Sequence, residues 1–171
     1  EETFYQSNLE ARRLLLERFT QAQLHFLEHH LCHAASAYVV SPFDEAAILT
    51  IDGIGEFHST WLGVGREGKI EPICRIPYPH SLGFLWEKMS ELLGFDAYSG
   101  PGKMMGYGCI TDPLGELSGR DHLSTMREIL RLNSDGSFWV YNEVMRFRTS
   151  DFSELERRFG PRRKSVVDRY E

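Results

Sequence analysis

The stretch of sequence with the most evident chemical potential is a cluster of histidines. Four of the seven histidines of the chain lie within nine positions: His25, His29, His30 and His33. If residues 29–33 are helical, His29 and His33 lie four positions apart on one face, and His30 is three positions from His33. Neutral imidazoles at that spacing can bind one transition-metal ion. The alternative is a set of histidines at a helix start that hydrogen-bond to backbone or carboxylate groups.

Asp52 is the second candidate for this chemistry. It ends an apolar run at residues 46–52. Gly53 follows it directly, and Glu56 lies four positions after Asp52. A carboxylate at a strand end beside a glycine turn can hold a metal ion or a metal-bound phosphate, because glycines let backbone N–H groups approach phosphate oxygens. The alternative is a plain hairpin turn, for which Asp-Gly is common. The sequence therefore offers His29, His33 and Asp52 as a candidate metal site.

Two further stretches could hold an anion. Ser81 and Gly83 lie where a helix is expected to begin, and a helix N-terminus offers N–H donors to an anion. Simple N-capping by Ser81 is the alternative. A glycine-rich segment at residues 100–108 surrounds Lys103, but it lacks the spacing and the Lys-Ser/Thr pair of a P-loop. An ordinary surface loop is the alternative there.

The elements that must position these residues follow from hydrophobic periodicity. Helices are expected at residues 9–19, 30–40, 81–94, 121–132 and 151–159, and strands at residues 24–27, 46–52, 57–65, 69–76 and 137–141. Short polar connections between the three strands in residues 46–76 predict an antiparallel meander. Pro72 predicts an edge position or a bulge in the last of them. The order of helices and strands indicates an α/β or α+β fold.

Composition narrows the class of protein. The 171 residues are 42% hydrophobic and 26% charged, with a net charge of -6, which is typical of a soluble globular protein and excludes a fold-wide basic surface for nucleic acid. The basic cluster at residues 157–164 is expected to be a solvated face or a local anion contact. Cys32, Cys74 and Cys109 form no CxxC pair, which favours a reducing compartment. With neither a signal peptide nor a long apolar run, the expected location is the cytoplasm, with no membrane partner.

Four stretches together resemble one family of enzymes. They are HHLCHAASAYVVSPF at 29–43, AAILTIDGIGE at 46–56, PHSLGFLWEKMSELLGF at 79–95 and GKMMGYG at 102–108. In this order they resemble the O-carbamoyltransferases, a family that includes nodulation-factor, cephalosporin-type and aminoglycoside carbamoyltransferases. The resemblance covers roughly residues 25–165.

The resemblance implies an α/β fold, a partial actin-like ATPase (RNase H-like) domain with a three-strand meander followed by helices. Residues 1–45 would form the end of the first actin-like subdomain, including the HHxxH helix. Residues 46–171 would form the second subdomain, truncated. In such enzymes a YrdC-like domain, expected in the full-length chain, makes carbamoyl-adenylate from ATP and carbamoyl phosphate. The actin-like domain then moves the carbamoyl group to a hydroxyl of a small-molecule acceptor.

The resemblance also implies a set of site residues. Two histidines of the HHxxH stretch and the aspartate of the IDGxGE stretch hold Fe²⁺ or another divalent metal, together with a later aspartate. Carried over, the first three are His29, His33 and Asp52. Asp52, Gly53, Ser81 and Gly83 would lie near the ATP or carbamoyl-adenylate. The resemblance assigns no catalytic residue, and the identity of the acceptor cannot be read from this stretch.

Departures from the family pattern lead to further expectations. The 171 residues include neither the early histidine and aspartate of the family's opening strands nor its later aspartate ligand. They include no stretch that resembles a YrdC-like domain. Gly106 is followed directly by Tyr107, where the family has additional residues. The chain is therefore expected to be a fragment that is inactive alone. One alternative is a tRNA threonylcarbamoyltransferase-like protein, against which the negative charge and the HHxxH pattern count. The other is a non-catalytic nucleotide-binding module.

Overall fold

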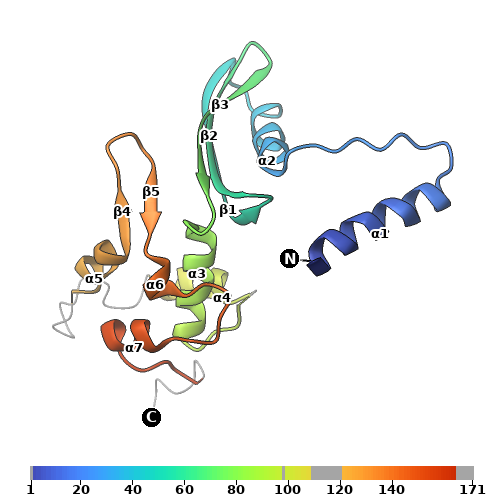
Figure 1. Cartoon of the computed structure of the whole chain (residues 1–171). Helices are drawn as coiled ribbons and strands as arrows, with labels where there is room; N and C mark the ends of the chain where they lie inside the picture. Colours follow the sequence, from blue (N-terminus) through green and yellow to red (C-terminus); the bar gives the residue numbers. More distant parts are fainter. Residues whose placement is uncertain (1, 98, 109–120, 165–171) are drawn as a thin grey trace.

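The computed structural model describes residues 2–97, 99–108 and 121–164 (Figure 1). Its centre is an antiparallel sheet of β1 (Glu45–Gly55), β2 (His58–Arg66) and β3 (Lys69–Pro77), in the order β1-β2-β3. The predicted meander is confirmed. Two tight turns make it possible, because Glu56 and the pair Glu67 and Gly68 adopt positive φ angles of 59°, 52° and 73°. Among the described strands, β3 lies at an edge of the sheet, as Pro72 predicted.

One face of the sheet is covered by helix α2 (His29–Tyr38). The contact is a small core of Ala34, Tyr38, Ile48 and Trp61, with Trp61 only 1% exposed. Close approach depends on Gly65, where a Cβ would lie 2.6 Å from the Tyr38 ring. Burial of a side chain such as that of Ile48 stabilises the contact by roughly 1.5–3 kcal/mol. α2 is thereby fixed along the sheet, with its first turn near the end of β1.

A second, larger core lies beyond the sheet. It joins α3 (Leu82–Leu92), α5 (His122–Ile129), α6 (Asn142–Met145), α7 (Ser153–Phe159) and the hairpin of β4 (Leu130–Leu132) with β5 (Phe138–Val140). Ile129, Met145 and Leu155 are completely buried there. The fold is thus a mixed α/β arrangement, with a three-stranded antiparallel sheet followed by helices.

The structure differs from the prediction in three segments. Residues 24–27 form no strand, since Phe26 and Leu27 are largely exposed and no other strand lies beside them among the described residues. The helix predicted at residues 121–132 ends at Ile129, because Leu130–Leu132 pairs with β5 across a turn that contains Gly136 at φ 84°. The glycine-rich segment is a helix, α4 (Gly100–Gly108), packed against α3.

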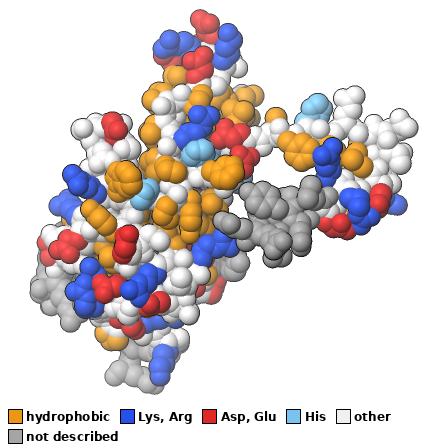
Figure 2. All heavy atoms as spheres, viewed as in Figure 1, with side chains coloured by type: hydrophobic (Ala, Val, Ile, Leu, Met, Phe, Trp, Pro, Cys, Tyr) orange, Lys and Arg blue, Asp and Glu red, His pale blue; other side chains and the backbone are white. Residues whose placement is uncertain are grey.

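Helix α1 (Glu2–Arg18) stands apart from the rest of the chain in Figure 1. Arg13 forms ion pairs with Glu10 and Glu17 along its surface, while Leu14, Leu15 and Leu16 remain partly exposed. Figure 2 shows further hydrophobic side chains gathered on the visible face of the main body. Within the described ranges, no helix has both the length and the apolar character needed to cross a bilayer.

The two cysteines among the described residues form no crosslink. Cys32 is exposed on α2 and Cys74 is half-buried on β3, and both are free. Cys109 lies outside the described residues.

Candidate metal centre

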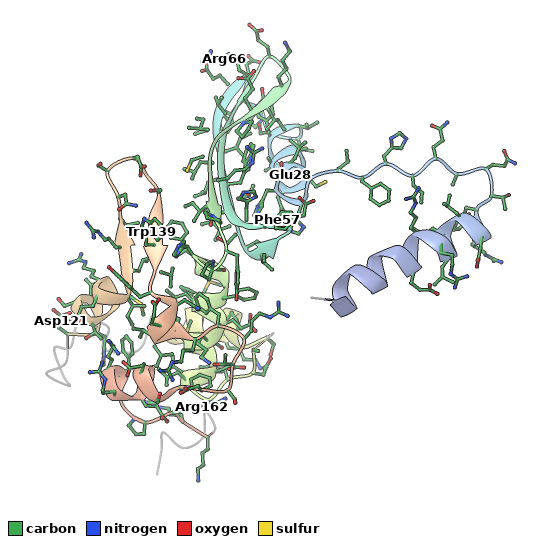
Figure 3. All side chains as sticks on the ribbon, viewed as in Figure 1. Glu28, Phe57, Arg66, Asp121, Trp139 and Arg162 are labelled. Carbon is green, nitrogen blue, oxygen red and sulfur yellow. The ribbon has the colours of Figure 1, made fainter. Side chains whose placement is uncertain are left out.

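The first turn of α2 carries the two predicted histidine ligands. Glu28 precedes the helix in an extended conformation, its carbonyl accepts from the Cys32 N–H, and its carboxylate lies 3.8 Å from the Arg75 guanidinium of β3 (Figure 3). This ion pair ties the start of α2 to the sheet. Because residues four apart share a helix face, His29 and His33 both project toward the end of β1.

Asp52 lies at an irregularity in β1. The regular pairing with β2 is interrupted between Ile51 and Gly55, so Asp52 is released from the strand ladder just before the hairpin turn. The Gly53 N–H donates to Asp52 Oδ1 at 2.7 Å. That bond leaves the other carboxylate oxygen, Oδ2, directed at the histidines.

Three side-chain atoms converge at this point. His29 Nε2 lies 2.6 Å from Asp52 Oδ2, His33 Nε2 lies 3.2 Å from the same oxygen, and the two Nε2 atoms are 3.0 Å apart. The side chains of His29, His33 and Asp52 are 41%, 52% and 36% exposed, so an ion could enter from solvent. Among the described residues, this trio is the group of histidine, cysteine and acidic side chains whose spacing would let them share a metal ion.

The carboxyl of Asp52 favours its charged form. Burial by itself would raise the pKa of Asp52, but the hydrogen bonds from His29, the Gly53 N–H and His33 outweigh it and hold the pKa below its ordinary value. An ionised carboxylate beside two imidazoles is a donor set suited to a divalent transition metal.

His30 has a different role from its neighbours. It is completely buried, with Nδ1 2.8 Å from Thr50 Oγ1 and Nε2 3.0 Å from the His58 carbonyl oxygen. Both ring nitrogens are therefore used in fastening α2 to β1 and β2. The sequence spacing predicts His30 within reach of the candidate site, but its ring packs against the sheet instead.

Ser81 and Gly83, where α3 begins, contact the end of β1 that carries Asp52. The Ser81 hydroxyl caps α3 by accepting from the Phe84 N–H at 3.0 Å, and it donates to the Gly53 carbonyl at 2.6 Å. A Cβ at Gly83 would lie 2.5 Å from the Asp52 carbonyl carbon. The structure thus brings Ser81 and Gly83 against the Asp52–Gly53 backbone, and the N-capping expected of Ser81 is present.

Other sequence candidates lie elsewhere. Glu56 is in the hairpin turn and is exposed, outside the converging trio. Lys103 is on α4, 3.9 Å from the Asp96 carboxylate. In the basic cluster at residues 157–164, Arg157 and Arg158 pair with Glu154.

Gly55 is a residue that the sequence did not single out. A Cβ at Gly55 would lie 2.2 Å from His29 Cδ2, so the absence of a side chain there sets the place of the imidazole. The second glycine of the Asp-Gly-Ile-Gly stretch was the available signal. Its meaning depends on which ring packs over it, and that is a tertiary contact.

The sequence profile of one protein family, described as "Carbamoyltransferase N-terminus", matches residues 2–159. An uncharacterized protein of Synechocystis is 43% identical over 146 residues, which cover 82% of this chain and 22% of that protein. The nodulation protein NolNO of Sinorhizobium fredii is 34% identical over 137 residues, which cover 76% of this chain and 19% of that protein. An uncharacterized protein of Methanocaldococcus jannaschii is 36% identical over 150 residues, which cover 79% of this chain and 24% of that protein. The chain spans about a fifth to a quarter of the length of these relatives.

Proposed function

The chain belongs to the family of carbamoyltransferase N-terminal domains, and from this premise we propose that it is the carbamoyl-transfer part of an ATP-dependent O-carbamoyltransferase. The whole protein would move carbamoyl from carbamoyl-adenylate to a hydroxyl of a small-molecule acceptor. The actin-like ATPase fold and the boundary between residues 45 and 46 belong to the same proposal. A nodulation protein among the relatives supports the transferase class.

The observation that carries this proposal is the convergence of His29, His33 and Asp52. Two ligand atoms bound at about 2.1 Å to one ion lie about 3.0 Å apart on adjacent octahedral positions. The three measured separations, from 2.6 to 3.2 Å, bracket this value. Two imidazoles and one carboxylate on one face of an ion are a common donor set for Fe²⁺ and leave other positions open.

Hydrogen bonding alone does not account for all three contacts. With Asp52 ionised, both histidine Nε2 atoms must carry protons to donate to Oδ2, and then two N–H groups face each other at 3.0 Å. If either Nε2 is deprotonated, its lone pair instead faces the carboxylate oxygen. A cation bound between the three atoms removes this conflict, because it interacts favourably with every lone pair.

The residues of the chain would contribute by orientation. When bound, a divalent cation would supply Lewis-acid polarisation of a phosphate or carbonyl oxygen. His29 and His33 would present imidazole nitrogens from one helical turn, and the Gly53 N–H fixes which oxygen of Asp52 faces them. Ser81 and Gly83 hold the backbone of Asp52 in place. Nucleotide contacts of Asp52, Gly53, Ser81 and Gly83 stay a prediction from the resemblance.

Metal analysis of the full-length protein tests the site. We expect about one Fe²⁺ or similar ion per chain after anaerobic loading. The variants His29→Ala, His33→Ala and Asp52→Ala should each lose most of it. His25→Ala is the matched control, since this exposed histidine lies outside the trio. Equal metal content in the control and in the His29 and His33 variants would rule out the assignment.

The reaction needs a separate test. Full-length protein with ATP and labelled carbamoyl phosphate should transfer label to hydroxylated small molecules. Label that appears on tRNA instead would replace the proposed acceptor class. A protein that binds nucleotide but transfers no label to either acceptor would contradict the enzymatic proposal.

A further inference from the structure

A cavity of about 330 Å³ lies between helix α3 and the segment that joins α6 to α7. One face of α3 lines it with residues at helical spacing, which are Phe84, Glu87, Lys88 and Glu91. The rest of the lining comes from residues 147–150, Phe152 and Arg162. The volume is at the small end of the range for ligand-binding cavities, so we expect a small ligand.

Two positive charges of the lining share one aromatic ring. Lys88 is only 4% exposed, and its Nζ donates to the Thr149 carbonyl at 2.6 Å and lies 3.7 Å from the centroid of the Phe152 ring. Arg162, labelled in Figure 3, has its Cζ 4.0 Å from the same centroid. Burial first, and then the positive charge of Arg162, lower the pKa of Lys88. An anionic group bound in the cavity would offset the repulsion between these two cations.

Arg148 adds a third cation from an unusual backbone conformation. Its φ of 59° is uncommon for a residue other than glycine, and such residues cluster at binding and active sites. Its Cζ lies 5.9 Å from the centroid of the Phe84 ring. Within the described residues the guanidinium makes neither a hydrogen bond nor an ion pair, so its donors are available to a ligand.

Two carboxylates lie among these cations. Glu87 and Glu91 are four positions apart on α3 and half-buried, and in the described part of the chain neither carboxylate has a hydrogen-bond or ion-pair partner. Burial first, and then the negative charge of Glu91, raise the pKa of Glu87. An ammonium group bound beside the two carboxylates would offset the repulsion between them.

We propose that this cavity binds a small α-amino acid with an apolar side chain, in its zwitterionic form. The carboxylate of the amino acid would pair with the guanidinium of Arg148, and its ammonium group with Glu87 and Glu91. Its side chain would pack against the rings of Phe84 and Phe147, whose centroids are 5.9 Å apart.

Other classes of small ligand match the lining less well. A simple anion would be repelled by the two glutamates, and a simple cation by the lysine and the two arginines. An uncharged ligand would displace water from these charged groups without pairing with them. A zwitterion carries both charges on adjacent atoms and brings no net charge into the cavity.

The cavity is distinct from the histidine–aspartate site, although the two are neighbours. The Phe84 ring separates them, since a Cβ at Gly53 would lie 3.0 Å from its Cε1 atom. Amino-acid binding does not depend on the proposed carbamoyl transfer, because none of the charged residues of the cavity belongs to the metal-binding trio.

Titration of the full-length protein with glycine, L-alanine, L-leucine and L-phenylalanine, followed by calorimetry and saturation-transfer NMR, tests the proposal. We expect at least one to bind saturably with a dissociation constant of about 1 mM or below. Arg148→Gln and Glu87→Gln should each weaken this binding at least about tenfold, because each removes a charge-assisted pair. Neither residue is buried, so both variants should fold. Arg127→Gln and Glu128→Gln are the matched controls, since these exposed residues lie outside the cavity.

Blocked ligands test each end of the zwitterion. The N-acetyl form of the tightest-binding amino acid lacks the ammonium group and its methyl ester lacks the carboxylate, so each should bind at least about tenfold more weakly. His29→Ala should keep full amino-acid binding while it loses metal, which separates this proposal from the proposed function. The proposal is overturned if no amino acid saturates, if Arg148→Gln or Glu87→Gln binds as wild type does, or if either blocked form binds as tightly as the free amino acid.

Discussion

Gly55 lies directly against the imidazole of His29: a Cβ at this position would stand 2.2 Å from Cδ2 and 2.7 Å from Cγ of the ring. Gly55→Ala must therefore push the ring away from Asp52 Oδ2. Changes that misorient a metal ligand typically weaken metal affinity by about 10–100-fold. We expect a loss of that size, measured by Co²⁺ titration of the absorption spectrum. Gly102→Ala is the control, since no atom lies within 4 Å of its added methyl group. Unchanged Co²⁺ affinity and spectrum in Gly55→Ala would contradict this role.

The adjacent histidines of α2 should separate into a ligand and a structural residue. His30→Ala removes a buried ring and leaves Thr50 Oγ1 and the His58 carbonyl without a partner, so we expect it to lower the free energy of unfolding by about 2–4 kcal/mol. His29→Ala, with a side chain 41% exposed, should cost less than about 1 kcal/mol in the absence of metal. Urea unfolding of both variants measures the difference. Similar costs for the two would show that His30 does not fasten α2.

Ser81 should contribute more than an ordinary helix cap. Ser81→Ala removes the cap of α3, worth about 1 kcal/mol. It also removes the hydroxyl that donates to the Gly53 carbonyl. An unpaired buried carbonyl costs about 1–3 kcal/mol, and we expect a further loss near the lower end of that range for this part-buried one. Asp121→Ala provides the comparison, because Asp121 caps α5 in an exposed position. Equal losses in urea unfolding would mean that the bond from Ser81 to β1 adds nothing.

Acid should weaken α7 through Glu154. Hydrogen bonds from Arg157 and then Arg158 lower the pKa of Glu154 to about 2, compared with about 4.3 for an unperturbed glutamate. Because the folded-state pKa is depressed, the stabilisation is complete above about pH 4.3 and is lost as the pH falls through about 2. The difference in unfolding free energy between wild type and Glu154→Gln should therefore shrink between pH 5 and pH 2.

The comparison for this titration is Glu128→Gln, since Glu128 makes no ion pair within the described residues. A wild-type minus Glu154→Gln difference that stays constant with pH would show that the ion pairs of α7 do not stabilise the fold.

Local patterns predicted the parts of the fold that local physics determines. The meander followed from alternating strands with short polar turns, and α3 followed from Ser81 at its start and an apolar stripe. The convergence of His29, His33 and Asp52 was expected from i, i+4 spacing and a strand end, helped by the family resemblance. Where tertiary pairing overrides propensity, prediction failed: Leu130–Leu132 continues a helical pattern but pairs with β5.

Packing contacts are the other feature that the sequence could not predict. His30 has the same residue type as the two predicted ligands and lies between them, yet its ring is buried against Thr50. Which way each imidazole turns depends on where α2 crosses the sheet. That crossing is set by contacts such as Tyr38 on Gly65, which no local pattern in the sequence encodes.

The position of β1 at the border of its sheet bears on how the protein behaves in concentrated solution. β1 spans eleven residues and pairs only with β2 within the described residues, so the backbone donors and acceptors of its other border pair with no described strand. Leu49 and Ile51 are 59% and 51% exposed on the same strand. Such a border is a template onto which a second polypeptide can add by backbone pairing, and the exposed aliphatic side chains reinforce the addition. Isolated chains should therefore self-associate through β1 as their concentration rises, whereas a protein that covers this border with a strand of its own would remain dispersed.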